Sequence, residues 1–217
     1  MGSSGTGVRL LPGQRPVRYE GEGRVSAVWT DRGERLPADM VVQGVGVQLN
    51  VEMARDAGLE MADKGVACDR TLRASHPQVY VAGDLAAYED VIFGQGRLRV
   101  EHWDTALHQG MVAGANMAGE EQVYERLPYF YSLLFGLYFQ AWGNLTGMDR
   151  VVARGRFAEG SFARFYFSRG ILNAVLAAGW PRVELETAQH WIRVRKRFDD
   201  VGPLLADEKV PLTEAIP

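Results

Sequence analysis

The sequence predicts an α/β portion followed by an α+β domain that is built on an antiparallel sheet. In the first part, the runs 39–45 and 77–82 are almost continuously apolar, as strands covered on both faces are. A helical pattern follows over 106–117. Residues 129–180 are instead rich in aromatic and β-branched residues between glycine-containing turns, which is typical of antiparallel strands. An amphipathic helix is predicted over 183–198.

Composition and charge exclude several classes of protein. The 217 residues suffice for one large domain or two small ones, and a formal charge of −3 gives no attraction for nucleic acid or for an anionic membrane. The most apolar run, 129–142, is interrupted by polar residues and falls short of the roughly 20 apolar residues that span a bilayer. The single cysteine, Cys68, excludes an internal disulfide and a CxxC redox pair. We therefore expect a reducing, cytoplasmic location.

Neither a metal site nor a nucleophilic catalytic residue is expected. The four histidines are too scattered to bind a metal together. Ser132 lies in an aromatic run and not in the sharp strand-to-helix turn that presents a nucleophilic serine. The basic run 193–197 is expected to be a solvated helix face, with a docking patch for an acidic redox partner as the alternative. The tail from Gly202 is expected to lie on the surface or to be disordered.

The start of the chain is expected to form a small antiparallel meander that returns to a central strand. Residues 1–7 are small and flexible and resemble a leader. Strands are predicted over 8–11 and 25–30, and the run 39–45 is the central strand. Gly33 suits the turn after the second strand, because glycine adopts positive φ without a steric penalty.

Two helices are predicted in the α/β portion. The first spans 51–57, with Asn50 as its N-cap and Gly58 as its C-terminal stop. The second spans 106–117, and one stripe of it is apolar. The members of that stripe are Leu107, Met111, Ala115 and Ala118.

Two strand ends carry residues suited to a ligand. Gly44 and Gly46 follow the first apolar run, and glycine lets backbone approach a cofactor closely, although two glycines also suit a simple tight turn. Gly83 and Asp84 follow the second run, at the kind of strand end where open α/β sheets bind ligands. The Asp84 carboxylate can accept hydrogen bonds from sugar or polyol hydroxyls, or it can cap a turn.

A third segment precedes the helix over 106–117. A helix N-terminus offers free N–H groups and the positive end of the helix dipole, which suit an anionic or electron-rich ring edge. Trp103 offers a flat face that can stack on an aromatic ring, or it can belong to the core. Asp104 or Thr105 can equally cap the helix.

Five motifs occur in an order that resembles a known family. They are GVGVQLN (44–50), AGLEMADKGVACDRTLRAS (57–75), VYVAGD (79–84), RVEHWDTALHQGMVAGANMAG (99–119) and PYFYSLLFGLYFQAWG (128–143). Together they resemble the second half of FAD-dependent ferredoxin reductases and of apoptosis-inducing factor, in the pyridine nucleotide-disulfide oxidoreductase superfamily. The resemblance runs from about residue 8 to residue 199, nearly the whole chain.

The resemblance implies an incomplete FAD/NAD(P)-binding Rossmann-type portion followed by the family's C-terminal reductase domain. It assigns 8–43 to the end of the NAD(P)H-binding domain, 44–119 to the second segment of the FAD-binding domain and 124–200 to the C-terminal domain. Residues 1–7 would be a leader or a truncation point, and 201–217 a tail.

The resemblance also implies a set of cofactor-binding residues. Asp84 would bind the ribityl and pyrophosphate region of FAD, and Trp103 would lie near the nicotinamide side of the flavin. The helix N-terminus would face the pyrimidine edge of the ring. The implied set is Gly44, Gly46, Gly83, Asp84, Glu101, His102, Trp103 and Thr105.

Some features depart from the family pattern. No G-x-G-x-x-G follows an early strand, so the fingerprints for the adenylate half of FAD and for NAD(P)H would precede Met1. Leu133 follows Ser132 where the family commonly has aspartate, and Gln48 replaces a proline.

Two hypotheses of function follow from the resemblance. In the first, a parent enzyme passes electrons from NAD(P)H through FAD to a ferredoxin-like or quinone-like acceptor, and the isolated chain is inactive. In the second, the chain is a truncated or split non-catalytic module that binds a partner polypeptide. The expected partners are an N-terminal half or a ferredoxin-like redox protein, and a homo-oligomer is a further expectation.

Overall fold

The computed structural model describes residues 7–198 and 202–215 in two compact units, Met1–Gln48 and Leu49–Pro217. Residues 1–6 of the predicted leader lie outside the described residues, as do 199–201 and 216–217. The predicted domain boundaries stay predictions.

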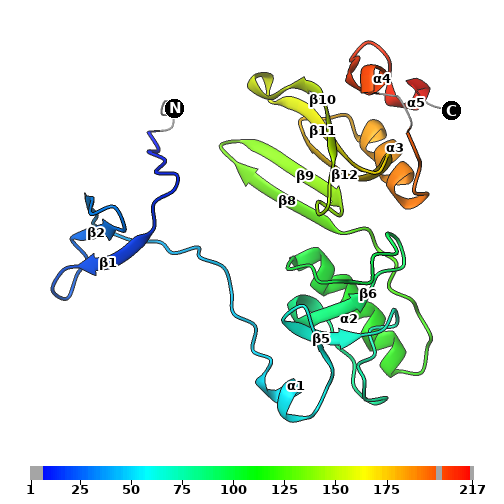
Figure 1. Ribbon diagram of the computed structural model, residues 1–217, viewed down its shortest axis with the longest axis horizontal. Coiled ribbons are helices and arrows are strands. Elements are labelled where there is room, and N and C mark those ends of the chain that lie inside the picture. The colour runs from blue at the N-terminus through cyan, green and yellow to red at the C-terminus, as the bar shows by residue number, and fades with distance from the viewer. Residues whose placement is uncertain (1–6, 199–201, 216–217) are drawn as a thin grey trace. The chain divides into compact units, whose positions relative to one another are not determined.

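The first unit contains an antiparallel meander, but of its three strands only the second corresponds to a predicted one. Strands β1 (Pro16–Glu20), β2 (Ala27–Thr30) and β3 (Arg35–Pro37) pair antiparallel in the order β1-β2-β3 (Figure 1). Gly33 has a φ of +77° in the turn between β2 and β3, as its sequence context predicted. Residues 8–11 form no strand, so that prediction was wrong. The first strand begins only after Pro12-Gly13.

The predicted central strand over 39–45 is also absent. This run has no regular secondary structure, and its large apolar side chains are exposed: 78% for Met40, 87% for Val42 and 80% for Val45. A strand needs a neighbouring strand to satisfy its backbone N–H and C=O groups, and no described residue pairs with this run. Apolar composition alone is therefore not enough to make this run a strand.

The carboxylate of Glu20 joins the three strands of the meander. It accepts hydrogen bonds from Trp29 Nε1 at 2.7 Å and from Arg35 Nη2 at 2.6 Å. These bonds, with that from Arg35 foremost, lower the pKa of Glu20 to about 2.

The contacts of Glu20 predict an acid-sensitive meander. The contribution of Glu20 to stability is complete above the ordinary glutamate pKa of about 4.3 and is lost as the pH falls towards about 2, because protonation removes the acceptor charge. The indole N–H resonance of Trp29 should therefore move in that pH window. Glu20→Gln should abolish the movement, and a resonance that stays constant from pH 5 to pH 2 in the wild type would contradict the assignment.

The α/β part of the second unit consists of short strands covered by one long helix. The sheet order is β4-β5-β6-β7, and the pairing of β5 with β6 is the only parallel one among the described residues. The strands are β4 (Met61–Ala62), β5 (Gly65–Cys68), β6 (Ala86–Glu89) and β7 (Arg97–Leu98). Helix α2 (Trp103–Met117) adds Ala113 to the core that β5 and β6 form. The parallel pair and its helix are the Rossmann-type portion that was predicted.

The helices of this part differ from the prediction in detail. Helix α1 (Glu52–Asp56) exists as predicted, but its N-cap is Val51 and not Asn50. Helix α2 begins three residues earlier than predicted and exposes Leu107 and Met111 of its apolar stripe. Its buried face is instead largely polar. It comprises Asp104, Thr105, Gln109, Ala113 and Asn116.

The second apolar run, 77–82, is not a regular strand. Its one pairing is an isolated bridge between Tyr80 and Arg73, although Val81 is buried in the same core as β5. Two backbone hydrogen bonds, from Ala74 N–H to the Val79 carbonyl and from Val81 N–H to the Leu72 carbonyl, hold the run together with its packing, without a regular ladder. The run leads into the 3-10 turn η1 (Gly83–Leu85).

The predicted antiparallel sheet forms the C-terminal part. Its order is β10-β11-β12-β9-β8. The strands are β8 (Tyr129–Leu134), β9 (Leu137–Gly143), β10 (Arg150–Arg156), β11 (Ser161–Ser168) and β12 (Ile171–Ala178), with the 3-10 turn η2 (Phe157–Glu159) before β11. Helix α3 (Arg182–Arg193) packs on β12 (Figure 1), and its residues Leu185, Ala188 and Ile192 are buried in the core that β12 shares. The predicted helix over 183–198 was therefore correct up to Arg193, beyond which Arg195 has a φ of +54°.

The described part of the tail is packed and not merely on the surface. It forms the short helices α4 (Gly202–Ala206) and α5 (Leu212–Ala215). Leu205 and Leu212 are fully buried in the same core as Phe165 and Trp191. The expectation of a surface or disordered tail was therefore wrong for these residues.

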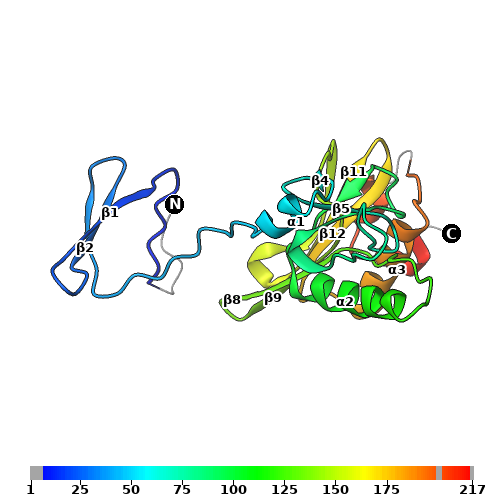
Figure 2. The ribbon, with the colours of Figure 1, turned by 90° about the horizontal axis from the view of Figure 1, so that it is seen from below.

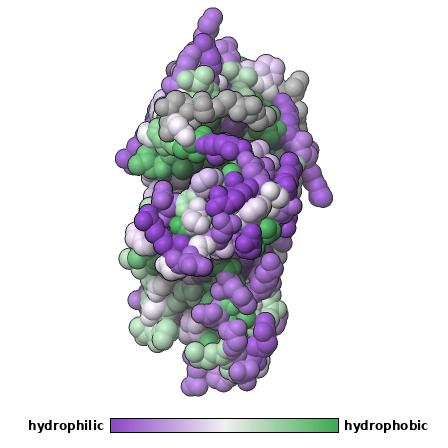
Figure 3. Space-filling view, turned by 90° about the vertical axis from the view of Figure 1, so that its left-hand side faces the viewer, coloured by the Kyte–Doolittle hydropathy of each residue, from purple (hydrophilic) through white to green (hydrophobic). Residues whose placement is uncertain are grey.

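Many large hydrophobic side chains reach the surface. Patches of hydrophobic residues interrupt the hydrophilic ones over the face drawn in Figure 3. Three consecutive exposed apolar residues form the tip of the β8–β9 hairpin: Leu133, Leu134 and Phe135 are 68%, 53% and 70% exposed. Among residues 7–198 and 202–215, no helix combines the length and the apolar character that crossing a bilayer requires.

Candidate functional site

The turn η1 lies against the first turns of α2. The Gly83 N–H donates to Gln109 Oε1 at 2.8 Å, and both residues are buried. Gly83 has a φ of +75°, and a Cβ at this position would lie 3.4 Å from the Ala106 Cβ. Asp84 follows directly and is half-buried. The turn that carries Asp84 therefore packs against the first turns of α2.

The first turn of α2 is held by polar contacts. His102 is the N-cap, and its Nδ1 accepts from the Asp104 N–H at 3.2 Å. Asp104, 7% exposed, receives a bidentate pair of bonds from Arg126 at 2.9 and 3.0 Å. Those bonds raise the pKa of Arg126. A carboxylate at a helix N-terminus also interacts favourably with the helix dipole.

The ring of His102 lies among aromatic side chains of β8. Its centroid is 6.1 Å from that of Tyr129, 5.5 Å from Phe130 and 5.2 Å from Tyr131. Burial, together with the hydrogen bond between the Tyr129 and Tyr138 hydroxyls, raises the pKa of Tyr129. The C-terminal sheet therefore contributes directly to the position of the α2 N-terminus.

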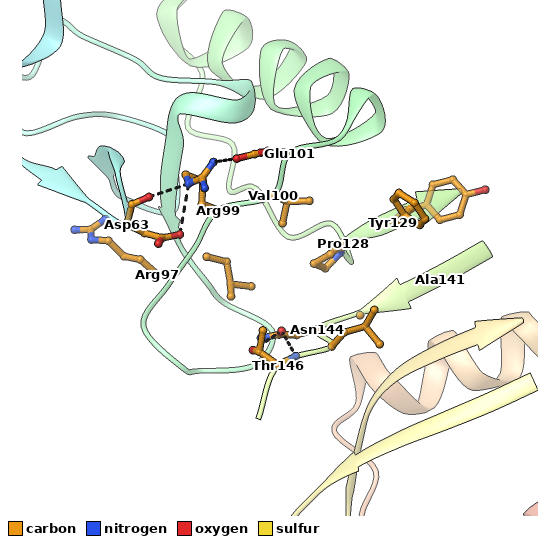
Figure 4. A pocket seen from close by; sticks show the side chains of 14 residues that line it. Asp63, Arg97, Arg99, Val100, Glu101, Pro128, Tyr129, Ala141, Asn144 and Thr146 are labelled. Atoms are coloured by element: carbon orange, nitrogen blue, oxygen red, sulfur yellow. Dashed lines mark hydrogen bonds and ion pairs between the residues drawn. The ribbon is translucent and has the colours of Figure 1, made fainter. Parts of the chain in front are cut away.

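A cavity of about 390 Å³ opens beside this helix start (Figure 4). Its wall is formed by the run from Arg97 to Glu101 on one side and by β8, β9 and the turn after β9 on the other. Figure 4 shows Arg99 between Asp63 and Glu101, with dashed lines to both. The polar side chains Asn144 and Thr146 of the opposite wall bond to each other.

The structure brings together most of the predicted site residues. Gly83, Asp84, Glu101, His102, Trp103 and Thr105 all lie on η1, on the first turn of α2 or on the residues just before it. Trp103 is 67% exposed, whereas Thr105 is 1% exposed, so the Thr105 side chain faces the interior. Gly44 and Gly46 belong to the first unit, and their role stays a prediction.

Three residues of the site were missed by the sequence analysis. Gln109 bonds Gly83, Arg126 pairs with Asp104, and Arg99 contacts both Asp84 and Glu101. The alternation of Arg97, Arg99 and Glu101 was a usable signal, because it places three charges on one side of an extended run. Gln109 and Arg126 gave no comparable pattern.

The residues present fit the ring and ribityl half of a flavin. Gln109 Nε2 is buried and has no hydrogen-bond partner, so this side of η1 retains an unused donor. Trp103 supplies an exposed flat face beside the positive end of a 15-residue helix. An exposed ring next to helix N–H groups suits an electron-rich aromatic ligand.

Comparison with known families accounts for most of the chain. Residues 3–110 match the pyridine nucleotide-disulphide oxidoreductase family, and residues 129–216 match the reductase C-terminal family. The second match includes α4 and α5, which agrees with the packed tail.

Curated relatives and solved structures agree with these matches. The chain is 31% identical over 213 residues to putidaredoxin reductase of Pseudomonas putida, covering 97% of the chain and 49% of the relative. It is 34% identical over 161 residues to the ferredoxin–NAD(+) reductase component of the anthranilate 1,2-dioxygenase system of Burkholderia cepacia, covering 74% of the chain and 39% of the relative. The chain thus spans half or less of these relatives.

A crystal structure of a ferredoxin reductase from Rhodopseudomonas palustris superposes with a TM-score of 0.87 at 33% identity, covering 98% of this chain and 52% of that one. The putidaredoxin reductase in a covalent complex with putidaredoxin gives a TM-score of 0.83 at 31% identity, covering 94% and 48%. The partial Rossmann-type sheet and the C-terminal sheet are those of the ferredoxin reductase fold. The chain therefore belongs to the pyridine nucleotide-disulphide oxidoreductases, and its relatives are ferredoxin reductases of the putidaredoxin reductase type.

Proposed function

We propose that the chain is the C-terminal portion of a cytoplasmic FAD-dependent NAD(P)H oxidoreductase that passes electrons to a ferredoxin-like acceptor. The observation that carries the proposal is the contact of η1 with the first turns of α2, in which the Gly83 N–H donates to Gln109 Oε1 at 2.8 Å. Asp84 follows Gly83 on η1, and the exposed Trp103 begins α2. When bound, FAD supplies the redox chemistry by taking a hydride from NAD(P)H and passing electrons on singly.

Each residue of the site has a binding or orienting role. The Asp84 carboxylate accepts hydrogen bonds from ribityl hydroxyls, and the α2 N-terminus faces the electron-rich edge of the ring. Trp103 stacks on an aromatic face, and Glu101 is held by Arg99 at 2.6 Å. Thr105 contributes through its backbone, because its side chain is buried. Gly44 and Gly46 would allow backbone to approach the cofactor.

The apolar tip of the β8–β9 hairpin is the proposed contact for the acceptor protein. The tip projects from the rest of the second unit in both ribbon views (Figures 1 and 2). It carries the exposed residues Leu133, Leu134 and Phe135, and its base contacts His102 through Tyr131. An apolar patch of this kind is typical of a protein-binding surface.

Flavin titration of the purified chain tests the proposal. We expect riboflavin 5′-phosphate and FAD to bind with comparable affinity, because the site contacts the ring and ribityl chain and the sequence has no G-x-G-x-x-G loop for an adenylate. Trp103→Ala should weaken binding about fivefold, which corresponds to about 1 kcal/mol of stacking, and should reduce the quenching of flavin fluorescence. Isothermal titration calorimetry and fluorescence give the two readouts.

Phe157→Ala is the matched control for Trp103→Ala. Phe157 is 59% exposed on η2 and is outside the proposed site, so its removal should leave flavin affinity unchanged. Failure of the chain to take up either flavin at millimolar concentration would count against the proposal and for the non-catalytic module. FAD binding much more tightly than riboflavin 5′-phosphate would show that the site is wrongly assigned.

A further inference from the structure

We infer that Arg99 is a positioning residue that holds the flavin-facing segments in register with one another. The inference rests on the proposed function and adds to it a residue that touches no cofactor itself. Arg99 is well placed for such a role, because its side chain is only 13% exposed and lies at one end of the cavity of Figure 4.

One guanidinium joins three separate segments of the chain. Arg99 Nε donates to the Asp63 carbonyl oxygen at 2.8 Å, in the turn between β4 and β5. Nη1 donates to the Asp84 carbonyl oxygen at 3.2 Å and to Glu101 Oε1 at 2.6 Å. The rigid planar fork of arginine suits such divergent partners, whereas a lysine ammonium on a flexible stem does not fix their directions.

The β4–β5 hairpin is built to receive this side chain. A Cβ at Gly65 would overlap the Leu85 carbonyl oxygen and would lie 3.0 Å from Arg99 Cδ. Glycine at this position therefore lets the hairpin pack directly on η1 and on the stem of Arg99. The hairpin, η1 and the residue before the α2 N-cap thus meet at Arg99.

The charge of Arg99 matters as well as its shape. Glu101 lies two residues before Trp103, where the proposed ring sits, and Arg99 is its ion-pair partner. Loss of the guanidinium would leave the Glu101 carboxylate without that partner and the Asp84 carbonyl without its donor. Both changes act on the flavin site while Asp84 and Trp103 themselves stay intact.

The test compares Arg99→Met with Arg164→Met in the whole 217-residue chain. Arg164 lies on β11, is likewise partly buried, donates to the Ala163 carbonyl oxygen at 3.1 Å and is not among the residues that line the cavity. In the absence of flavin, Arg99→Met should speed hydrogen exchange of the Gly83–Leu85 amides about tenfold, as expected for one charge-assisted hydrogen bond. Arg164→Met should leave their exchange unchanged, and Arg99→Lys should restore part of the protection.

A flavin readout separates positioning from general stability. With riboflavin 5′-phosphate bound, Arg99→Met should shift the visible flavin spectrum and weaken binding about tenfold, with Arg164→Met like the wild type. Unchanged exchange at Gly83–Leu85 in Arg99→Met, or an equal rise in both variants, overturns the inference. If the wild-type chain takes up no flavin, the proposed function fails, and the exchange comparison still decides whether Arg99 positions η1.

Discussion

Replacing Arg154 with alanine is expected to lower the free energy of unfolding of the second unit by about 3–5 kcal/mol. Arg154 lies on β10 with a side chain that is 2% exposed. Its Nη1 donates to the carbonyl oxygens of Leu205 at 3.2 Å and Asp207 at 2.6 Å, and its Nη2 donates to that of Val210 at 2.7 Å. The buried Arg154 side chain therefore binds the segment that contains α4 to the sheet through hydrogen bonds to its carbonyl oxygens.

The cost is large because Arg154 also compensates a buried acid. Glu184 Oε2 lies 3.6 Å from Arg154 Nε, which makes an ion pair without a hydrogen bond, and it also accepts from Trp180 Nε1 at 2.9 Å. The indole of Trp180 lies under the guanidinium, 5.6 Å from its carbon. Alanine would leave Glu184 with its charge uncompensated in a site where its side chain is 13% exposed.

Chemical denaturation followed by circular dichroism measures this effect. Arg156→Ala is the matched control, because Arg156 is on the same strand and pairs with Glu159 where both side chains are mostly exposed. The control should cost less than about 1 kcal/mol. Hydrogen exchange should show Leu205 losing protection in Arg154→Ala alone. Equal midpoints for the two variants would show that Arg154 does not fasten this segment.

Arg154 also illustrates what the sequence pattern could and could not predict. Strand β10 alternates, and Arg154 is on the buried side with Val152. The period of two places both residues on one face of the sheet, but it does not reveal that the tail supplies carbonyl oxygens to a cation there. The packed tail was missed for the same reason, since its burial depends on a partner about fifty residues earlier in the chain.

Local signals predicted the antiparallel sheet well. Most of its strands pair with the next strand in the chain, so turn residues and alternation suffice, and only the β9–β12 pairing is more distant. The runs 39–45 and 77–82 failed because a strand is defined by its neighbour, and neither run has a strand partner among the described residues. Apolar composition alone does not supply the neighbouring strand that a strand needs.

The face of α2 was misjudged because its buried groups are polar. Gln109 bonds the Gly83 N–H, and Asn116 donates to the carbonyl oxygens of Thr71 and Gln122. A prediction from hydropathy puts such polar residues on the exposed face of a helix. Here each of them instead forms hydrogen bonds with buried backbone groups that would otherwise have no partner. The site residues were predicted from the order of the motifs and not from any single periodicity, and their binding role stays a prediction.

The second large effect is expected at Gly143, where alanine should cost about 4 kcal/mol of unfolding free energy. Gly143 ends β9 with a φ of +97° and pairs with Ala174 of β12. A Cβ here would overlap the Asn173 carbonyl oxygen and would lie 2.9 Å from Ala174 Cα. Both obstacles are backbone, so no side-chain rotation can relieve them. Asn173 O also accepts from the Asn144 N–H at 3.0 Å, so moving it away would break that bond.

Gly147→Ala separates steric overlap from backbone strain. Gly147 lies in the next turn with a φ of +67°, and a Cβ there would meet no atom within 4 Å. Its replacement should therefore cost only the strain of a left-handed alanine, about 1 kcal/mol. The difference between the two variants, about 3 kcal/mol, isolates the close approach of β9 to β12.

Gly143 also lines the cavity beside Arg99. Gly143→Ala should therefore perturb the cavity residues in an amide correlation spectrum, while Gly147→Ala should not. Equal losses of stability in the two variants would contradict this prediction, because they would mean that the β12 backbone moves aside for the Cβ of Gly143→Ala.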